Sequence, residues 1–485
     1  MRVGSRVLLR RIRSSTWLLI ALQILALAGL AKVYYLTFPV QSNSGHDFRL
    51  LYGAAQLMRA HQNPYDAATF QHQVVADGMP IGYLMFHGEL GQPYVYPPLF
   101  AWLVIPFTYL SIWRALFAWR VLSCLCVFAG ALGLTSLWDS APGARFFDGR
   151  ANRVLLATLA ASSPLALYAA YWGNPVVLVY CAMGLWAWAL KRNNARADSL
   201  AGVLMSVALL KPQLAFPLTV FAVFCLIQGQ GAWARRLRVA LSFGAALVVL
   251  LALDILITGP SLLLAWPASV STLSQLIYLQ TDMPTLAGLL QPTLVQHSVR
   301  VQTLSLYGIA VLGLIVALVL YLRVHRTWVP GALLAVLTAI WCFASPYSHA
   351  NDEVFYLPLG IAIVAVLAAM CERDVAGLTF RKLGRRIHEY ARLAIQAAVS
   401  ALALVVLWLG GALQLRYGTV VLHVALLPGH LLQLRWSATI VPLAVLVAFF
   451  ADWNFHRRRT QEAAAVDKQL LSTGHETLLT PSLGS

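Results

Sequence analysis

Residues 17–36 read WLLIALQILALAGLAKVYYL, a predominantly apolar run of 20 residues. A helix of about this length crosses the ~30 Å hydrocarbon core of a bilayer, so the run predicts a membrane span. Five arginines precede it, at positions 2, 6, 10, 11 and 13. The run is longer than the apolar part of a signal peptide, and no small-residue cleavage site follows it. We therefore expect an uncleaved first span.

Runs of this kind recur along the whole chain. The sequence is 60% hydrophobic and 11% charged, with a mean hydropathy of +0.71. Soluble domains do not reach this composition over 485 residues, so the sequence predicts a polytopic membrane protein. Runs near 20 residues favour helices, because the strands of a membrane barrel would alternate over about ten residues.

The net charge of +17 is gathered into clusters in alternate gaps between the apolar runs. Because cytoplasmic loops are enriched in Lys and Arg, this pattern indicates topology and contact with anionic lipids rather than nucleic-acid binding. The six cysteines lie within apolar runs, without the spacing of a metal site or a disulfide framework. The basic clusters are residues 2–13, Arg145/Arg150/Arg153, Lys191/Arg192/Arg196, Arg235/Arg236/Arg238, Arg323/Arg326, residues 373–392 and Arg457–Arg459.

The charge alternation predicts an all-α polytopic fold with about 12 transmembrane helices and both termini in the cytoplasm. We expect a single domain over residues 1–455 and a disordered cytoplasmic tail at 456–485. Residues 41–113 form the first external loop, with juxtamembrane helices after Asp47 and at 97–112; a second external loop covers 258–300. The remaining spans are expected at 115–137, 155–171, 176–190, 200–210, 214–226, 239–257, 304–322, 328–344, 354–371, 393–415 and 439–450.

This topology places a set of polar residues at or near the external surface. It was built from apolar runs and basic clusters alone, so the gathering is independent support for an external site. The residues are Asp47, Asp66, Asn174, Lys211, His349 and Asp352.

Asp47 begins an amphipathic stretch with helical spacing, in a chain with only 18 acidic residues. Two roles fit it: an N-terminal cap favoured by the helix dipole, and a catalytic base. Asp66, in Asn63-Pro64-Tyr65-Asp66, fits the turn that ends this helix, with substrate contact as the alternative.

Lys211 lies between two apolar runs and precedes Pro212. A lysine here is costly unless it pairs, and either a phosphate or a carbonyl would serve. Tyr96 is suited either to anchoring at the membrane boundary or to lining the route of an amphiphile. His349 fits a phosphate contact or a simple interfacial position, and Asp352 fits a helix cap or the site.

No local spacing supports a metal site. Motifs for nucleotide binding or for a hydrolase nucleophile are also missing from the sequence. A transporter or flippase for an amphiphile is the alternative function, although we find none of the paired broken helices of inverted repeats.

The motifs resemble, in their order, those of glycosyltransferase family 87. This family contains polyprenyl-phosphate-dependent enzymes of the GT-C superfold, among them bacterial mannosyl- and arabinofuranosyltransferases. Two positions depart from the family pattern: the usual Gly-Gln is Gly173-Asn174, and the usual Tyr-Asp is Asn351-Asp352. The motifs are Asp47 with Tyr52-Gly53-Ala54-Ala55, Asn63-Pro64-Tyr65-Asp66, Tyr96-Pro97-Pro98-Leu99, Gly173-Asn174, Leu210-Lys211-Pro212, and Ser345-Pro346 with Asp352.

The resemblance implies sugar transfer from a polyprenyl-phosphate donor to a lipid or glycan acceptor. The reaction would invert the anomeric centre on the periplasmic side of the bacterial inner membrane, without a metal or cofactor. Asp47 would be the general base, and Lys211 and His349 would hold the leaving phosphate. The further substrate contacts would be Tyr96, Asn174, Asp66 and Asp352.

Overall fold

A computed structural model of the protein describes residues 45–79, 85–86, 89–90, 93–138, 147, 149–207, 211, 233–276, 297–324, 329–345, 355–365, 368, 421–427 and 430–435. The expected spans at 17–36, 214–226, 393–415 and 439–450, the expected tail at 456–485, and the site residues His349 and Asp352 lie outside these residues.

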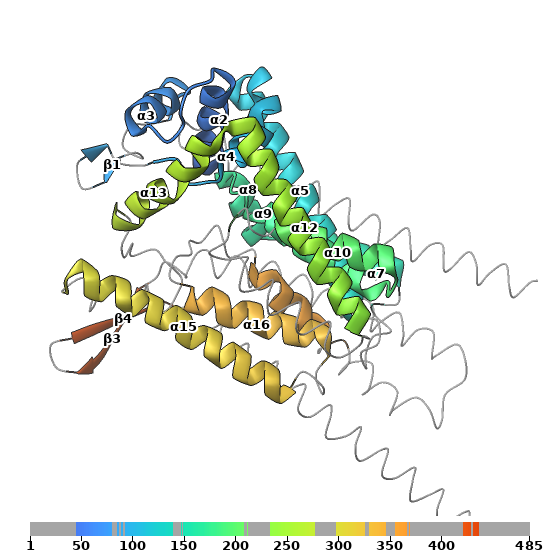
Figure 1. Ribbon diagram of the computed structural model, residues 1–485. Coiled ribbons are helices and arrows are strands. Elements are labelled where there is room, and N and C mark those ends of the chain that lie inside the picture. The colour runs from blue at the N-terminus through green and yellow to red at the C-terminus, as the bar shows by residue number, and fades with distance from the viewer. Residues whose placement is uncertain are drawn as a thin grey trace, which may run out of the picture.

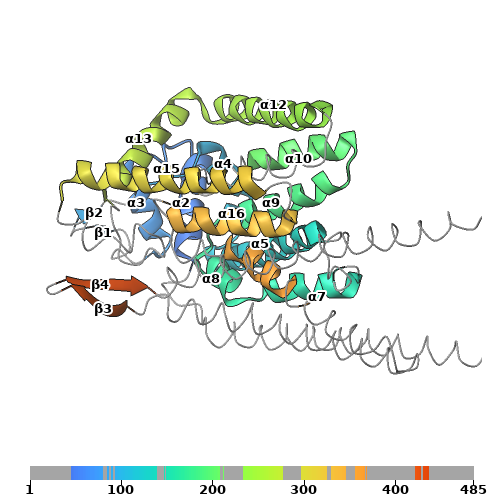
Figure 2. The ribbon, with the colours of Figure 1, turned by 90° about the horizontal axis from the view of Figure 1, so that it is seen from below.

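Helices dominate the described part of the chain, and they form one elongated bundle (Figures 1 and 2). At one end are α2 (His46–Arg59), α3 (Ala67–Ala76) and α4 (Pro98–Val104), which continues into the 3-10 turn η2 (Ile105–Tyr109). The rest are α5 (Ile112–Thr135) with the turn η3 (Ser136–Trp138), α7 (Arg150–Ala161), α8 (Pro164–Trp172), α9 (Val176–Lys191), α10 (Ala195–Val207), α12 (Trp233–Thr258), α13 (Pro260–Leu276), α15 (Val299–Val324) and α16 (Pro330–Ala344).

Three helices in the described ranges are long and apolar enough to cross a membrane: 112–138, 233–258 and 304–323. They confirm the spans expected at 115–137, 239–257 and 304–322. The helices α9 and α16 fall where spans were expected but have fewer than 18 residues. A helical membrane protein is thus confirmed, and the total of about 12 spans stays a prediction.

The span expected at 155–171 is two helices rather than one. α7 and α8 meet at an angle of 49°, and together they have the length and composition of a fourth span. Pro164 opens α8 and has no N–H to continue the helical ladder. Ser163 caps the new helix by accepting from the backbone N–H of Ala166 at 3.3 Å.

The segment expected to be the first external loop contains the two expected helices, with one difference. The short helix α4 ends at Val104 and continues into η2, which contains Pro106. This agrees with the proline-broken segment expected at 97–112. In α2, nine of 14 residues are buried, and the helix contacts α3, α4 and α5. The apolar face of α2 therefore packs against protein rather than lipid, and the position of α2 relative to the membrane surface stays a prediction.

Several described elements were not expected, the helix α3 among them. The segment expected to be the second external loop contains the helix α13. Four strands form two antiparallel hairpins, β1 (Met85–Phe86) with β2 (Glu89–Leu90) and β3 (Val421–Leu427) with β4 (His430–Arg435). Apart from these short hairpins, the described elements are helices, as an all-α fold predicts.

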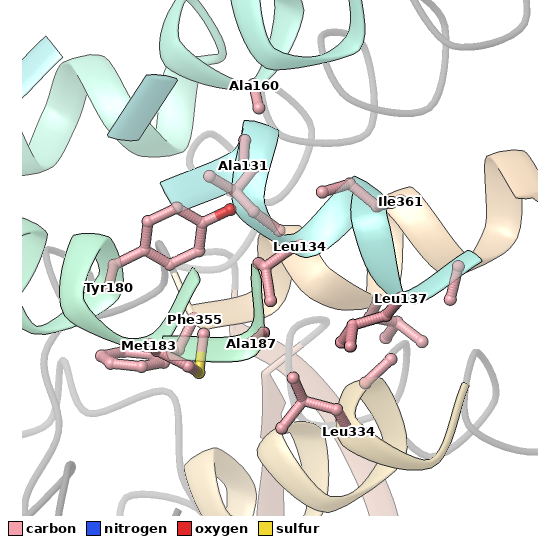
Figure 3. Close-up of a cluster of buried hydrophobic side chains, with 14 of the residues drawn as sticks. Ala131, Leu134, Leu137, Ala160, Tyr180, Met183, Ala187, Leu334, Phe355 and Ile361 are labelled. Atoms are coloured by element: carbon pink, nitrogen blue, oxygen red, sulfur yellow. The ribbon is translucent and has the colours of Figure 1, made fainter. Parts of the chain in front are cut away.

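The core is built where α5 crosses α9. A Cβ added at Gly184 would lie 2.0 Å from the Gly130 carbonyl oxygen, and one added at Gly133 would lie 2.1 Å from the Gly184 oxygen. Such small residues allow two helix backbones to approach closely. Around this crossing, Tyr180 and Met183 of α9 pack near Leu134 and against residues of the later helices (Figure 3).

A buried ion cluster closes the end of the bundle opposite α2. Asp198 of α10 accepts from Arg235 Nε at 2.8 Å and from Arg238 Nη2 at 3.0 Å. Arg235 also donates to the Leu190 carbonyl at the end of α9. Because α12 contacts α4 and carries these arginines in its first turns, it spans from the basic end to the α2–α4 end.

Candidate active site

Asp47 is the second residue of α2, and it does not cap the helix. The N-cap residue is Gly45, with φ of 76° and no side-chain cap. The N–H of Gly45 donates to the Tyr171 carbonyl at 3.0 Å, which joins the start of α2 to the end of α8. The capping role considered for Asp47 is therefore wrong, and its carboxylate is turned toward other side chains.

Both carboxylate oxygens of Asp47 have a partner. Oδ2 accepts from Asn174 Nδ2 at 2.7 Å, and Oδ1 lies 3.1 Å from His46 Nδ1. The side chains of His46 and Asp47 are each 15% exposed. The first turn of α2 favours a negative charge at this position. Asp47 is thus a fixed carboxylate that remains accessible.

Asn174 reaches Asp47 because a tight turn joins α8 to α9. Gly173 ends α8 with φ of 71°, and the N–H of Asn174 donates back to Ala169 at 3.0 Å. A Cβ at Gly173 would lie 2.4 Å from Phe48 Cβ, so only glycine fits here. Trp119 Nε1 fixes the turn by donating to the Gly173 carbonyl at 2.9 Å.

The same Asn174 side chain also holds Lys211. Its Oδ1 accepts from Lys211 Nζ at 3.1 Å and from the backbone N–H of Val176 at 2.9 Å. Lys211 is 4% exposed and Asn174 is 3% exposed. Three predicted site residues, Asp47, Asn174 and Lys211, therefore form one connected group. Because Asn174 is buried between the two charged groups, it is placed to orient them.

Tyr96 lies in a segment whose backbone is held by side chains of other elements. The carbonyl of Tyr96 accepts from Tyr65 Oη at 2.6 Å, and that of Val95 accepts from Trp266 Nε1 at 2.8 Å. The carbonyl of Tyr94 accepts from Ser269 Oγ.

The half-buried ring of Tyr96 begins a series of aromatic contacts that ends beside Asp47. It packs edge to face on Phe100 with ring centroids 5.7 Å apart. Phe100 lies 6.5 Å from Trp119, which lies 5.2 Å from Phe48. Tyr96 is thus joined by continuous packing to the residue next to Asp47.

Asp66 has the local role that its turn motif indicates. It is exposed and caps α3, accepting from the backbone N–H of Thr69 at 2.8 Å. Hydrogen bonding by Thr69, through its side chain first and its backbone N–H second, lowers the pKa of Asp66. Its hydrogen bonds within the described chain are all to the adjoining residues 63–70, so the structure does not join it to the Asp47 group.

A second polar network, which the sequence analysis missed, joins α2 to α3. Arg49 is buried and donates from Nη1 to the Gly78 carbonyl at 2.5 Å. Burial lowers the pKa of Arg49, and the charge of Asp77 partly opposes this. Burial also raises the pKa of Asp77 to about 6, although Gln73, Gln56 and Arg49 act in the other direction. Asp77 lies in a polar stretch with no motif, so nothing in the sequence singled it out.

No three His, Cys, Asp or Glu residues of the described ranges are close enough to hold a metal ion.

Family comparison supports the resemblance noted in the sequence. No curated protein matches the chain significantly. The model of glycosyltransferase family 87 matches residues 94–346, or 253 of the 485 residues. This match includes Tyr96, Asn174 and Lys211, and it favours an enzyme over a transporter. The chain belongs to glycosyltransferase family 87.

Proposed function

We propose that the protein transfers a sugar of the mannose or arabinofuranose type from a polyprenyl-phosphate donor to a lipid or glycan acceptor. The reaction takes place on the periplasmic side of the bacterial inner membrane. Family membership and the apolar helices support this. The position of the Asp47 group at the end of the bundle opposite the basic cluster agrees with an external site. A polyprenyl tail remains in the bilayer, so the donor needs no nucleotide-binding domain.

One observation carries the proposal: Asp47 and Lys211 are bonded to opposite ends of a single carboxamide, that of Asn174. Transfer from a sugar phosphate needs a base for the acceptor hydroxyl and a positive charge for the leaving phosphate. Here one amide holds a carboxylate and an ammonium group at a fixed spacing. Such an arrangement is preorganised for charge that develops during the reaction.

In the proposed step the acceptor hydroxyl oxygen attacks the anomeric carbon while Asp47 accepts its proton. The bond from the anomeric carbon to the phosphate oxygen breaks, and its electron pair leaves with the polyprenyl phosphate. A single displacement inverts the anomeric configuration. Lys211 binds the leaving phosphate through a charge-assisted hydrogen bond. His349 is a second phosphate contact in this proposal.

Three other residues complete the proposed site. Tyr96 is a contact for the lipid or the sugar, since aromatic rings offer an apolar face to both. Asp352 and the exposed Asp66 are polar contacts for the substrates. The membrane lipids around the protein bring the donor to the site by lateral diffusion.

The test compares purified wild type, Asp47→Asn and Asp66→Asn in nanodiscs, with chemically defined polyprenyl-phosphate sugars. The amide in Asp47→Asn cannot accept the proton, so turnover should fall by about 10²–10⁴. Asp66→Asn is the comparison, because it changes an exposed acid of the same loop that contacts substrate in this proposal without accepting the proton, so it should keep far more activity. Near-wild-type turnover by folded Asp47→Asn would overturn the proposal.

Two product measurements complete the test. The linkage of the product, read by NMR, should be inverted relative to the donor. Mass spectrometry of glycolipids and cell-wall glycans from cells with and without the gene identifies the natural acceptor.

A further inference from the structure

We propose that His46 is a positioning residue that holds the Asp47 carboxylate in place through its Nδ1 atom. The inference rests on the proposed function, because it assigns a role to His46 in setting the geometry of the base. Nδ1 of His46 lies 3.1 Å from Asp47 Oδ1, on the opposite oxygen from the Asn174 contact. A carboxylate only accepts hydrogen bonds, so Nδ1 is the nitrogen that carries the proton.

The imidazole is itself held by the end of α8. Its ring packs edge to face on Trp172, with centroids 5.8 Å apart and an interplanar angle of 74°. Trp172 in turn packs against Tyr168 and Tyr171, at 6.0 Å and 5.8 Å. The hydrogen bond from Gly45 to the Tyr171 carbonyl fixes the backbone just before His46. The ring therefore has little freedom to turn away from Asp47.

Both contacts of Asp47 thus depend on the same turn between α8 and α9. Asn174 is part of this turn. Trp172, which immediately precedes Gly173, packs against the ring of His46. A partner on each carboxylate oxygen fixes the plane of the group. A base fixed in this way needs less reorganisation when the acceptor arrives.

Three substitutions of His46 separate the role of Nδ1 from other roles. The amide nitrogen of Asn is bonded to Cγ, as Nδ1 of His is, whereas that of Gln is one atom further out, near the place of Nε2. His46→Asn should therefore keep turnover within about threefold of wild type. His46→Gln and His46→Leu should lower kcat by about ten- to a hundredfold, the range for one hydrogen bond to a charged group. The KM for the donor should stay nearly unchanged.

The controls distinguish this role from folding and from failure of the proposed function. His72→Gln changes an exposed histidine of α3 and should leave kcat unchanged. Thermal unfolding and donor binding are measured for every variant. In an Asp47→Asn background, His46→Gln should have no further effect on the residual turnover.

Results that contradict the role of His46 can be told apart from results that contradict the proposed function. Equal losses in His46→Asn and His46→Gln, or an effect of His46→Gln that persists without the Asp47 carboxylate, would overturn the role of His46. So would wild-type kcat in His46→Leu. High activity of Asp47→Asn alone would instead overturn the proposed function.

Discussion

The side-chain amide of Asn174 donates to Asp47 Oδ2 at 2.7 Å, across 127 positions of the chain. The carbonyl oxygen of the same amide accepts from Lys211 Nζ, so one small side chain connects the proposed base with a buried cation. This makes the turn between α8 and α9 the centre of the site. It also makes the turn the most informative place for substitutions.

Asn174→Ala should lower turnover by about a hundredfold, because it removes one hydrogen bond from Asp47 and one from Lys211. The measurement is kcat per folded molecule with a defined donor. Asn152→Ala is the matched control, since Asn152 is 4% exposed and lies in α7. The control should lower stability without changing kcat. Equal kcat in the two variants would show that Asn174 has no role beyond packing.

Gly173→Ala should destabilise the protein by about 2–4 kcal/mol and reduce activity. The substitution combines a left-handed backbone conformation, with φ of 71°, and a Cβ placed 2.4 Å from Phe48 Cβ. Gly244→Ala is the control, because a Cβ there meets nothing within 4 Å and α12 is helical around it. Thermal unfolding in nanodiscs measures both. A Gly173→Ala variant as stable as Gly244→Ala would contradict the geometry of the turn.

Lys211→Met should raise the Kd for the polyprenyl-phosphate donor by about ten- to a hundredfold, since it removes a charge-assisted contact to phosphate and keeps the apolar stem. Lys191→Met is the control. Lys191 lies at the end of α9 away from Asn174, where it donates to the Ser136 carbonyl. Donor binding to the purified variants is the measurement. If Lys211→Met bound the donor as wild type does, the lysine would serve only to hold Asn174.

Asp77→Asn should remove a pH dependence of stability between about pH 4 and pH 6. Burial raises the pKa of Asp77 to about 6 in the folded protein, from an ordinary value of 3.8. In this window the folded state keeps a proton that the unfolded state has lost, so the contribution of Asp77 to stability falls as pH rises. Above pH 6 it is at its lowest.

The gain in Tm from Asp77→Asn should therefore grow from pH 4 to pH 6. Asp66→Asn is a control of opposite sign. Hydrogen bonding by Thr69 lowers the pKa of Asp66, so its contribution is lost as pH falls through that lowered pKa. A difference in Tm between Asp77→Asn and wild type that does not vary with pH would contradict the assignment.

The long helices could be predicted from the sequence because their signal is local. The apolar runs at 115–137, 239–257 and 304–322 each correspond to a helix long enough to span. The break between α7 and α8 was missed although Ser163-Pro164 is a helix-start signal, because the apolar run continues across it. The burial of α2 could not be predicted for another reason: helical periodicity does not show whether the apolar face of a helix contacts lipid or protein.

The site could be predicted in part. Asp47, Asn174 and Lys211 were each expected near the external surface, because a polar residue at the end of an apolar run is visible in the sequence. Their contacts were not predictable, and His46 had no signal beyond its position next to Asp47. The polar network of Arg49 and Asp77 depends wholly on how α3 packs against α2.

Composition and charge pattern alone are enough to identify a helical membrane protein with a basic end and a polar end. Burial of apolar surface in lipid and the preference of Lys and Arg for one side depend on composition along short stretches. The meeting of Asp47, Asn174 and Lys211 depends on long-range packing, as does the fact that Asp47 does not cap its own helix. Those contacts come from the packing of α2 against the turn between α8 and α9, where Gly45 and Gly173 allow an approach that no local pattern encodes.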